Sequence, residues 1–500
     1  MSAPSDSPLV ANWGRYKRQP RRSLPGWCWL LVATAIVGLS AVGIWFASRS
    51  HPWRPPSGAP AFRSCTYGGY VNGWCASVRV PEDPRRPAGP TIALHVTVLP
   101  ATTRPADGAL FYLEGGPGGA ATASAIRVNA MFAGVGRRRD LVMVDQRGTG
   151  GSGPACPGGY VRGADAVAVT RYLRRCLDSL RGEPQLYTTS VAADDLEAVR
   201  RALGYGRIDL YGGSYGATLA QVYLRRHPAS VRTVVLDSGS LPDVRLYDVS
   251  PRNAERALDA QFARCAAQPP CARAYPHPRQ QLSELLARPP RPVGLASGTV
   301  VLRPDDVAWT VFWLSETAEG AALIPYALDS AVHGDYRVLA GVYASQLGGS
   351  NLDPLARVLP FWVILCSEPW GSMDPGATAR DGSSSYLAAA ALARARLFGR
   401  ACRVVPKGRV PRASGRLEVA RTHVLLLTGG DDPLDPVANL RSWRRVFPDG
   451  RLVVVPGAGH GTIEYACVQK LVARFVDRGT ATGIEASCVR HLPLPSFIVG

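Results

Sequence analysis

Residues 207–216 read Arg-Ile-Asp-Leu-Tyr-Gly-Gly-Ser-Tyr-Gly, a short apolar strand that runs into a G-x-S-x-G turn. The helix-forming segment Ala217-Thr-Leu-Ala-Gln-Val-Tyr-Leu-Arg-Arg226 follows directly. Glycines beside a serine let backbone pass where a Cβ would clash, so the serine hydroxyl stands alone at the tip of the turn. The stretch therefore predicts a nucleophile elbow centred on Ser214. In a chain with 52 glycines the alternative is an ordinary glycine-rich turn, so other motifs must decide.

Strand-like and helix-like segments alternate around this turn. Short apolar runs typical of buried parallel strands occur at 109–113, 141–145, 231–236, 423–427 and 451–455. With helical segments between them, these runs predict a mostly parallel, doubly wound α/β sheet. From 241 to 415 the pattern changes to helical stretches near 252–267, 278–287, 305–333 and 383–399. We therefore expect an α/β core over 63–240 and 416–500 with a mostly helical cap inserted at 241–415.

The N-terminus is typical of an exported or membrane-anchored protein. The basic stretch 1–23 precedes an uncharged, largely apolar run over 24–48, and a proline-rich tether follows at 49–62. The apolar run is long enough to cross a bilayer, and its basic flank is expected to stay cytoplasmic. This places the folded domain outside the cytoplasm, held to the cell membrane by the N-terminal helix. A cleaved signal peptide, which would leave the protein secreted, is the competing interpretation.

The formal charge of +19 is carried almost entirely by arginine, and beyond the N-terminus no long basic run occurs. We interpret this excess as scattered surface charge, and no nucleic-acid partner is expected. The sequence also contains no C-x-x-C or H-x-x-x-H cluster, so neither a metal site nor a cofactor is expected.

The cysteines agree with export. Apart from Cys28, ten of the eleven remain, and an even set in an exported chain is typical of disulfides. Sequence alone leaves the connectivity open, and isolated buried thiols are the alternative. Proximity along the chain favours five local pairs: Cys65–Cys75, Cys156–Cys176, Cys265–Cys271, Cys366–Cys402 and Cys467–Cys488.

A serine nucleophile needs a histidine to accept its proton and a carboxylate to orient that histidine. On a strand–turn–helix scaffold the chain order is serine, acid, histidine. His460 follows an apolar strand within the glycine-rich run 457–461 and is the candidate base. The alternative for any single histidine is a surface or core position without chemistry.

The acid is Asp431 or Asp432, both in the loop after the strand at 423–427. Asp435, directly before Pro436, has the pattern of a helix N-cap with proline at the first helical position. This structural explanation of Asp435 leaves Asp432 as the predicted orienting residue. Asp431 is then a solvated or capping neighbour.

The oxyanion that forms during acyl transfer needs preorganised N–H donors. Tyr215, the residue after the predicted nucleophile, supplies one N–H in an elbow of this kind. The Gly115-Gly-Pro-Gly turn after the strand at 109–113 is the expected source of the second, from Gly116. The alternative for this segment is an ordinary tight turn.

Five motifs in this order resemble the α/β-hydrolase peptidases of the proline iminopeptidase and secreted tripeptidyl aminopeptidase group. The resemblance covers roughly residues 62–490. It is carried by Gly115-Gly-Pro-Gly-Gly119, Val144-Asp-Gln-Arg-Gly-Thr-Gly-Gly-Ser152, Gly212-Gly-Ser-Tyr-Gly216, Asp432-Pro-Leu-Asp-Pro436 and Gly459-His-Gly461, together with Cys65, Cys75, Cys467 and Cys488.

This resemblance implies a serine exopeptidase that releases residues or short peptides from a free N-terminus beneath its cap. A cap carboxylate in such enzymes binds the α-ammonium group, and Leu365-Cys-Ser-Glu-Pro-Trp370 makes Glu368 the candidate. A salt-bridged or surface glutamate is the alternative for Glu368. An esterase or small-amide hydrolase on the same residues is the second functional hypothesis, because fold alone does not fix the substrate. A noncatalytic surface binding protein is the third.

Overall fold

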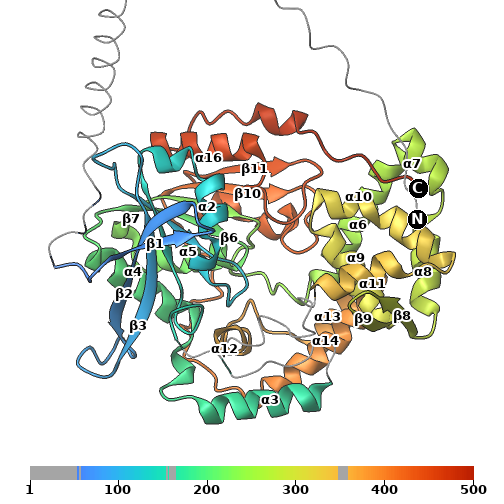
Figure 1. The fold of residues 1–500 in the computed structure, drawn as a ribbon, viewed down its shortest axis with the longest axis horizontal. Coiled ribbons are helices and arrows are strands. Elements are labelled where there is room, and N and C mark those ends of the chain that lie inside the picture. Colours follow the sequence, from blue (N-terminus) through green and yellow to red (C-terminus); the bar gives the residue numbers. More distant parts are fainter. Residues whose placement is uncertain (1–52, 54, 56–57, 154–155, 157–164, 347–358) are drawn as a thin grey trace, which may run out of the picture. The chain divides into compact units, whose positions relative to one another are not determined.

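A mixed sheet of nine strands forms the centre of the described chain (Figure 1). The computed structural model describes residues 53, 55, 58–153, 156, 165–346 and 359–500. The strand order is β1-β2-β3-β5-β4-β6-β7-β10-β11. The strands are β1 (Arg63–Tyr67), β2 (Val71–Pro81), β3 (Thr91–Leu99), β4 (Ala109–Leu113), β5 (Asp140–Val144), β6 (Ile208–Gly213), β7 (Val231–Asp237), β10 (His423–Gly429) and β11 (Arg451–Val455).

The sheet is parallel from β5 to β11, and only β1, β2 and β3 join it as antiparallel neighbours. In this register Gly212 lies beside Leu113 on one side and Leu236 on the other. The carboxyl ends of β4, β6 and β7 therefore meet at one edge of the sheet. The mostly parallel, doubly wound sheet expected from the sequence is confirmed.

Helices pack on both faces of this sheet. On one face, α2 (Ala125–Met131) and α16 (Ala466–Arg478) share an apolar cluster with alternate residues of the central strands, among them Leu110, Tyr211 and Leu425. The intervening positions, such as Phe111 and Leu210, point to the opposite face because strand side chains alternate. That face is covered by α4 (Thr189–Ala202) and α5 (Tyr215–Arg226).

The expected cap over 241–415 is largely helical but contains more elements than the sequence indicated. Its helices are α6 (Ser250–Ala266), α7 (Pro269–Ala274), α8 (Pro278–Ala287), α9 (Pro304–Ser315), α10 (Ala318–Val332), α11 (Arg337–Gln346), α12 (Leu359–Ser367), α13 (Pro375–Asp381) and α14 (Ala388–Ala401). A hairpin of β8 (Arg291–Leu295) and β9 (Gly298–Leu302) was not expected. The single helix expected at 305–333 is interrupted at Thr317, whose side chain caps α10 by accepting from the Gly320 N–H.

Two further helices lie outside the cap. α3 (Ala166–Ser179) precedes α4 and contacts α14 of the cap, and the short α15 (Trp443–Val446) precedes β11. Asp165 caps α3 by accepting from the Ala168 N–H. The loop after β5 is tied to α4 by Arg147, which donates two hydrogen bonds of 2.7 Å to the carboxylate of Asp195. The Arg in the Asp-Gln-Arg-Gly motif therefore fixes this loop to the scaffold.

All five disulfide pairs expected from sequence proximity are present: Cys65–Cys75, Cys156–Cys176, Cys265–Cys271, Cys366–Cys402 and Cys467–Cys488. The expected membrane or signal segment at 24–48 and its basic flank at 1–23 lie outside the described residues, as does most of the tether. Among the helices that the structure does describe, none combines the length and apolar character of a membrane span.

The turn between β6 and α5 depends on glycine at two positions. A Cβ on Gly212 would overlap the backbone oxygen of Gly216, and a Cβ on Gly216 would overlap the backbone oxygen of Leu113. Both obstacles are backbone atoms in the buried centre of the fold, so neither moves easily. This confirms the sequence interpretation that the flanking glycines let backbone pass.

We predict that Gly216→Ala lowers the free energy of unfolding by about 3 kcal/mol or more, because the methyl group meets buried backbone. Gly399→Ala is the matched control, since Gly399 lies in α14 with open space around its Cα. There, alanine should be neutral or stabilise by about 0.5–1 kcal/mol. Denaturant unfolding with the disulfides intact measures both, and equal stability of the two variants would refute the close-approach argument.

Candidate active site

Ser214 lies at the junction of β6 and α5 with a left-handed backbone, φ 55° and ψ −124°. Such a conformation costs on the order of 1–3 kcal/mol for a residue with a Cβ and persists where the surrounding structure fixes it. The Ser214 N–H donates to the backbone oxygen of Asp237 at 2.9 Å, which holds the turn against the end of β7. The structure thus has the sharp strand-to-helix turn that the sequence predicted.

The two predicted oxyanion donors lie at the same small cavity as Ser214. Gly116, Ser214 and Tyr215 all line this cavity, whose volume is about 30 Å³. Within the described residues, neither the Gly116 N–H nor the Tyr215 N–H has a hydrogen-bond acceptor. Two N–H groups without an acceptor in the described chain, at the same cavity as Ser214, have the chemistry that an oxyanion requires.

Asp432 and His460 meet across the loops that follow β10 and β11. His460 Nδ1 lies 3.0 Å from Asp432 Oδ2 and 3.2 Å from Oδ1. Asp432 is 1% exposed and also accepts the N–H groups of Leu434 and Asp435, each at 2.8 Å. Burial opposes its charge, but the His460 charge and these hydrogen bonds together hold the pKa of Asp432 below its usual value.

Asp435 does not cap a helix, so the sequence interpretation of this residue is wrong. The following turn is a short 3₁₀ segment, Val437–Leu440, whose N-cap is Pro436 and which has no side-chain cap. Asp435 is instead buried, accepts a hydrogen bond from Ser240 Oγ and lies 4.0 Å from His460 Nδ1. Because Asp435 also lines the Ser214 cavity, it connects the histidine to the serine in space.

The other two aspartates of this loop, Asp435 and Asp431, have different surroundings. Burial, with the nearby charge of Asp432, raises the pKa of Asp435 to about 7. Asp431 forms an ion pair with Arg264, Nη1 to Oδ2 at 2.8 Å, and so faces the cap helix α6 rather than the histidine. The choice of Asp432 over Asp431 as the partner of His460 therefore agrees with the geometry, although the reason given for Asp435 was incorrect.

Glu316 is a cap residue beside His460 that the sequence did not single out. It lies between α9 and α10, and its backbone oxygen accepts the His460 N–H at 2.7 Å. A Cβ on Gly459 would overlap this same oxygen, which explains the glycine before the histidine. The half-buried Glu316 carboxylate forms no ion pair within the described residues, and burial raises its pKa to about 7. Glu316 was missed because the sequence predicted one continuous helix near 305–333, whereas α9 ends at Ser315 and α10 begins at Ala318.

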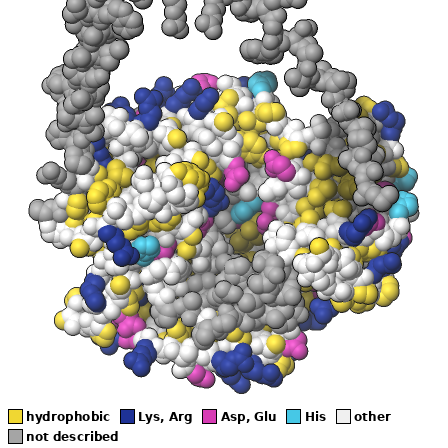
Figure 2. Space-filling model, in the orientation of Figure 1, with side chains coloured by type: hydrophobic (Ala, Val, Ile, Leu, Met, Phe, Trp, Pro, Cys, Tyr) yellow, Lys and Arg dark blue, Asp and Glu magenta, His cyan; other side chains and the backbone are white. Residues whose placement is uncertain are grey.

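The carboxylates determine how His460 titrates. Burial alone would lower the pKa of its imidazole, but the charges of Asp432, Asp435 and Glu316 outweigh this and raise it. The cationic form of the histidine is therefore stabilised at this position. Figure 2 shows histidine and acidic side chains lying together near the middle of the drawn face.

Asp237 is a second residue that sequence reasoning missed. Its buried carboxylate accepts from the Thr462 N–H at 3.0 Å, the Ile463 N–H at 2.9 Å and the Tyr211 hydroxyl at 2.8 Å. Ser238, the next residue, accepts the Gly461 N–H at 2.8 Å through its hydroxyl. The segment directly after His460 is thus fixed to the end of β7. The signal was the Leu-Asp-Ser end of that strand, a polar pair after an apolar run.

Glu368 does not line the Ser214 cavity but lines a larger cavity beside it, and its partner Trp370 lines both. It follows α12, is 4% exposed, and accepts hydrogen bonds from the Thr189 N–H, the Thr189 hydroxyl and Trp370 Nε1 at 2.7–2.8 Å. Both carboxylate oxygens therefore have donors within the fold. These bonds give Glu368 a structural role in joining α12 to α4, and its predicted amine-binding role remains a prediction.

Comparisons with known proteins agree with this architecture. Residues 108–269 match a family model described as alpha/beta hydrolase fold, and residues 389–488 match a model described as TAP-like protein. The chain is 33% identical over 186 residues to a tripeptidyl aminopeptidase of Streptomyces lividans, which covers 33% of this chain and 35% of the relative. It is 30% identical over 206 residues to the serine protease Hip1 of Mycobacterium tuberculosis, covering 37% and 39%.

The matched stretches span little more than one third of the length of these curated relatives. The family match to the alpha/beta hydrolase fold and the observed strand order of the sheet agree with each other. The chain has an α/β-hydrolase fold, and its matched stretches are similar to a tripeptidyl aminopeptidase, a member of the group that its motifs resemble.

Proposed function

We propose that this chain is a serine exopeptidase that releases residues or short peptides from a free N-terminus. The observation that supports this proposal most is that Ser214, Gly116, Tyr215 and Asp435 line one cavity, while His460 Nδ1 lies 3.0 Å from Asp432 and 4.0 Å from Asp435. We assign the hydrolase core to residues 63–240 and 416–500 and the cap to 241–415. The five disulfides support an extracytoplasmic location, which is part of the proposal together with N-terminal membrane anchoring.

In the proposed mechanism, Ser214 Oγ attacks the scissile carbonyl while His460 accepts its proton. Asp432 fixes the imidazole through Nδ1 and stabilises the imidazolium that forms. The N–H groups of Gly116 and Tyr215 donate to the oxyanion of the tetrahedral intermediate. His460 then protonates the leaving amine, and water hydrolyses the acyl-enzyme by the same steps.

Glu316 is the proposed anchor for the substrate's α-ammonium group. It comes from the cap, it has no ion-pair partner among the described residues, and it contributes electrostatically at His460 beside Asp432 and Asp435. A cation entering this region would gain from the Glu316 carboxylate, which the described chain leaves without an ion pair. Glu368, whose oxygens are already occupied, is the alternative anchor and is tested alongside.

Ser214→Ala should abolish labelling by a fluorophosphonate probe and lower peptide hydrolysis by about 10⁴-fold or more, because no other group supplies the nucleophile. Circular dichroism and thermal unfolding of the variant should match the parent chain, which separates lost chemistry from lost structure. Retained turnover in a folded Ser214→Ala protein would exclude the proposed mechanism.

N-acetylation of a peptide substrate should lower kcat/KM by roughly 10–100-fold, since a hydrogen bond to a charged group contributes about 1.5–3 kcal/mol. Glu316→Gln should remove most of this preference. Glu368→Gln is the control and should lower stability while leaving the preference intact, because it disturbs the Thr189 and Trp370 donors. Equal cleavage of free and blocked peptides, with esters cut well, would favour the esterase hypothesis instead.

On the acidic side of the pH profile, kcat/KM should rise with an apparent pKa above the ordinary histidine value of about 6.5. General-base catalysis needs neutral His460, and the pKa of this histidine is raised. Asp435→Asn removes a negative charge that favours the imidazolium, so this apparent pKa should move to lower pH. We expect roughly one unit, since a charge at about 4 Å is worth on the order of 1–4 kcal/mol. Asp431→Asn, at the residue paired with Arg264, should leave the apparent pKa unchanged, and a shift there would contradict the assignment.

A further inference from the structure

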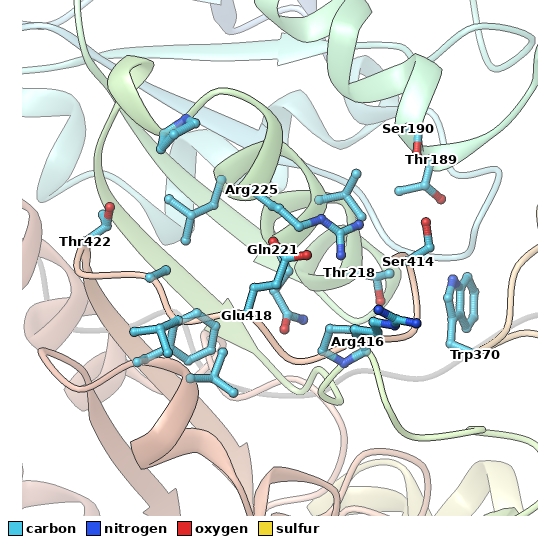
Figure 3. Close-up of a pocket in the computed structure, with 18 of the residues that line it drawn as sticks. Thr189, Ser190, Thr218, Gln221, Arg225, Trp370, Ser414, Arg416, Glu418 and Thr422 are labelled. Carbon is cyan, nitrogen blue, oxygen red and sulfur yellow. The ribbon is translucent and has the colours of Figure 1, made fainter. Parts of the chain in front are cut away.

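A second and larger cavity lies beside the helix that carries Ser214. Its volume is about 230 Å³, and it runs between α5 and the strap formed by residues 414–422 (Figure 3). Thr218, Pro242 and Trp370 line both this groove and the Ser214 cavity. The two spaces therefore share a wall, and an occupant of the groove touches residues of the candidate active site.

One end of the groove carries two arginines. In Figure 3, Arg225 and Arg416 point toward the end marked by Ser414 and Trp370. Arg225 donates to the backbone oxygen of Ala413 at 3.0 Å, which leaves further guanidinium N–H groups without an acceptor in the described chain. Arg416 is exposed and forms no ion pair within the described residues. This end is suited to a carboxylate, which guanidinium groups bind with geometric specificity.

Part of the groove lining is apolar and is called the apolar wall below. It is formed by a cluster of aliphatic and aromatic side chains: Val222, Leu224, Val419, Val446 and Phe447. Val419, within the strap, is 63% exposed. An apolar group that entered the groove would cover this side chain and pack against Phe447.

Polar groups interrupt the apolar wall. Gln221 donates through Nε2 to the backbone oxygens of Ala217 and Ser240, and this fixes its Oε1 as an acceptor without a partner in the described chain. The Ser414 hydroxyl also lacks a partner there. Burying an alkyl chain against such groups is unfavourable, because each unpaired buried polar atom costs about 1–3 kcal/mol. The lining thus matches an occupant that has amide groups as well as an apolar part.

We propose that the groove binds the C-terminal end of a peptide whose last side chain is apolar. The carboxylate lies at Arg225 and Arg416, the last side chain packs on the apolar wall, and the adjoining peptide groups run along the polar lining. Two carboxylates also line the groove. Glu418 opposes a bound carboxylate, whereas Glu368 is buried with both oxygens hydrogen-bonded to Thr189 and Trp370. Three arginines outnumber them: Arg225, Arg416 and Arg421. The proposal takes from the proposed function only the choice of a peptide as ligand.

The test uses the full chain with Ser214→Ala, so that binding is measured without turnover. N-acetyl-L-leucine has the carboxylate, the amide and the apolar side chain. N-acetyl-L-leucinamide lacks the charge, and hexanoate lacks the amide. Isothermal titration calorimetry should find that N-acetyl-L-leucine binds at least about tenfold more tightly than either compound, as expected for one charge-assisted hydrogen-bonded contact.

Single substitutions then locate the site. Arg416→Gln should weaken binding of N-acetyl-L-leucine about fivefold or more, whereas Arg412→Gln, at an exposed arginine of the preceding chain that does not line the groove, should have no effect. Glu418→Gln should tighten binding, since it removes the opposing charge. This change of sign distinguishes an electrostatic contact from a general loss of structure.

Several results would overturn the proposal. These are no binding below about 10 mM, equal binding of the acid and the amide, tighter binding of hexanoate, or equal effects of Arg416→Gln and Arg412→Gln. If the parent chain with Ser214 intact cuts no peptide while the Ser214→Ala variant binds as expected, the proposed function is rejected and the groove is kept. Peptide cleavage without this binding would do the reverse.

Discussion

The hydrogen bonds of Asp237 join the two parts of the candidate site. Its backbone oxygen accepts the Ser214 N–H, and its carboxylate accepts the N–H groups of Thr462 and Ile463, just after His460. The carboxylate also accepts the hydroxyl of Tyr211 on the neighbouring strand. The three donors to the carboxylate belong to buried residues, so its loss would leave them without this partner. A single residue at the end of β7 thus holds the serine turn through its backbone oxygen and the histidine loop through its carboxylate.

The cap contributes to the same site through backbone contact. The Glu316 oxygen accepts the His460 N–H, so the junction of α9 and α10 rests on the histidine loop and brings a carboxylate with it. Together with Asp432 and Asp435 it surrounds the imidazole with negative charge. This arrangement favours the imidazolium, which a general base forms during the reaction, and it also suits a positively charged substrate group. The junction of α9 and α10 therefore takes part in the electrostatics around His460.

Short stretches of sequence were sufficient to predict the features that depend only on neighbouring residues. The elbow at Ser214, the glycines that flank it, the parallel strands and the five neighbouring cysteine pairs were all predicted from short stretches and are present. Asp435 shows where local pattern failed. An aspartate before a proline is typical of a helix N-cap, but here Ser240 and His460, distant in sequence, surround it. Glu316 was missed for the same reason, because its neighbour His460 lies far along the chain.

The sequence by itself determined the fold class, the serine turn and the order of serine, acid and histidine, because strand periodicity and glycine sterics act over a few residues. Only the tertiary structure decided which carboxylates surround His460, that Glu368 is occupied by Thr189 and Trp370, and that a groove with Arg225 and Arg416 adjoins the serine cavity. Burial and charge depend on segments brought together from distant parts of the chain. No window of sequence contains that information.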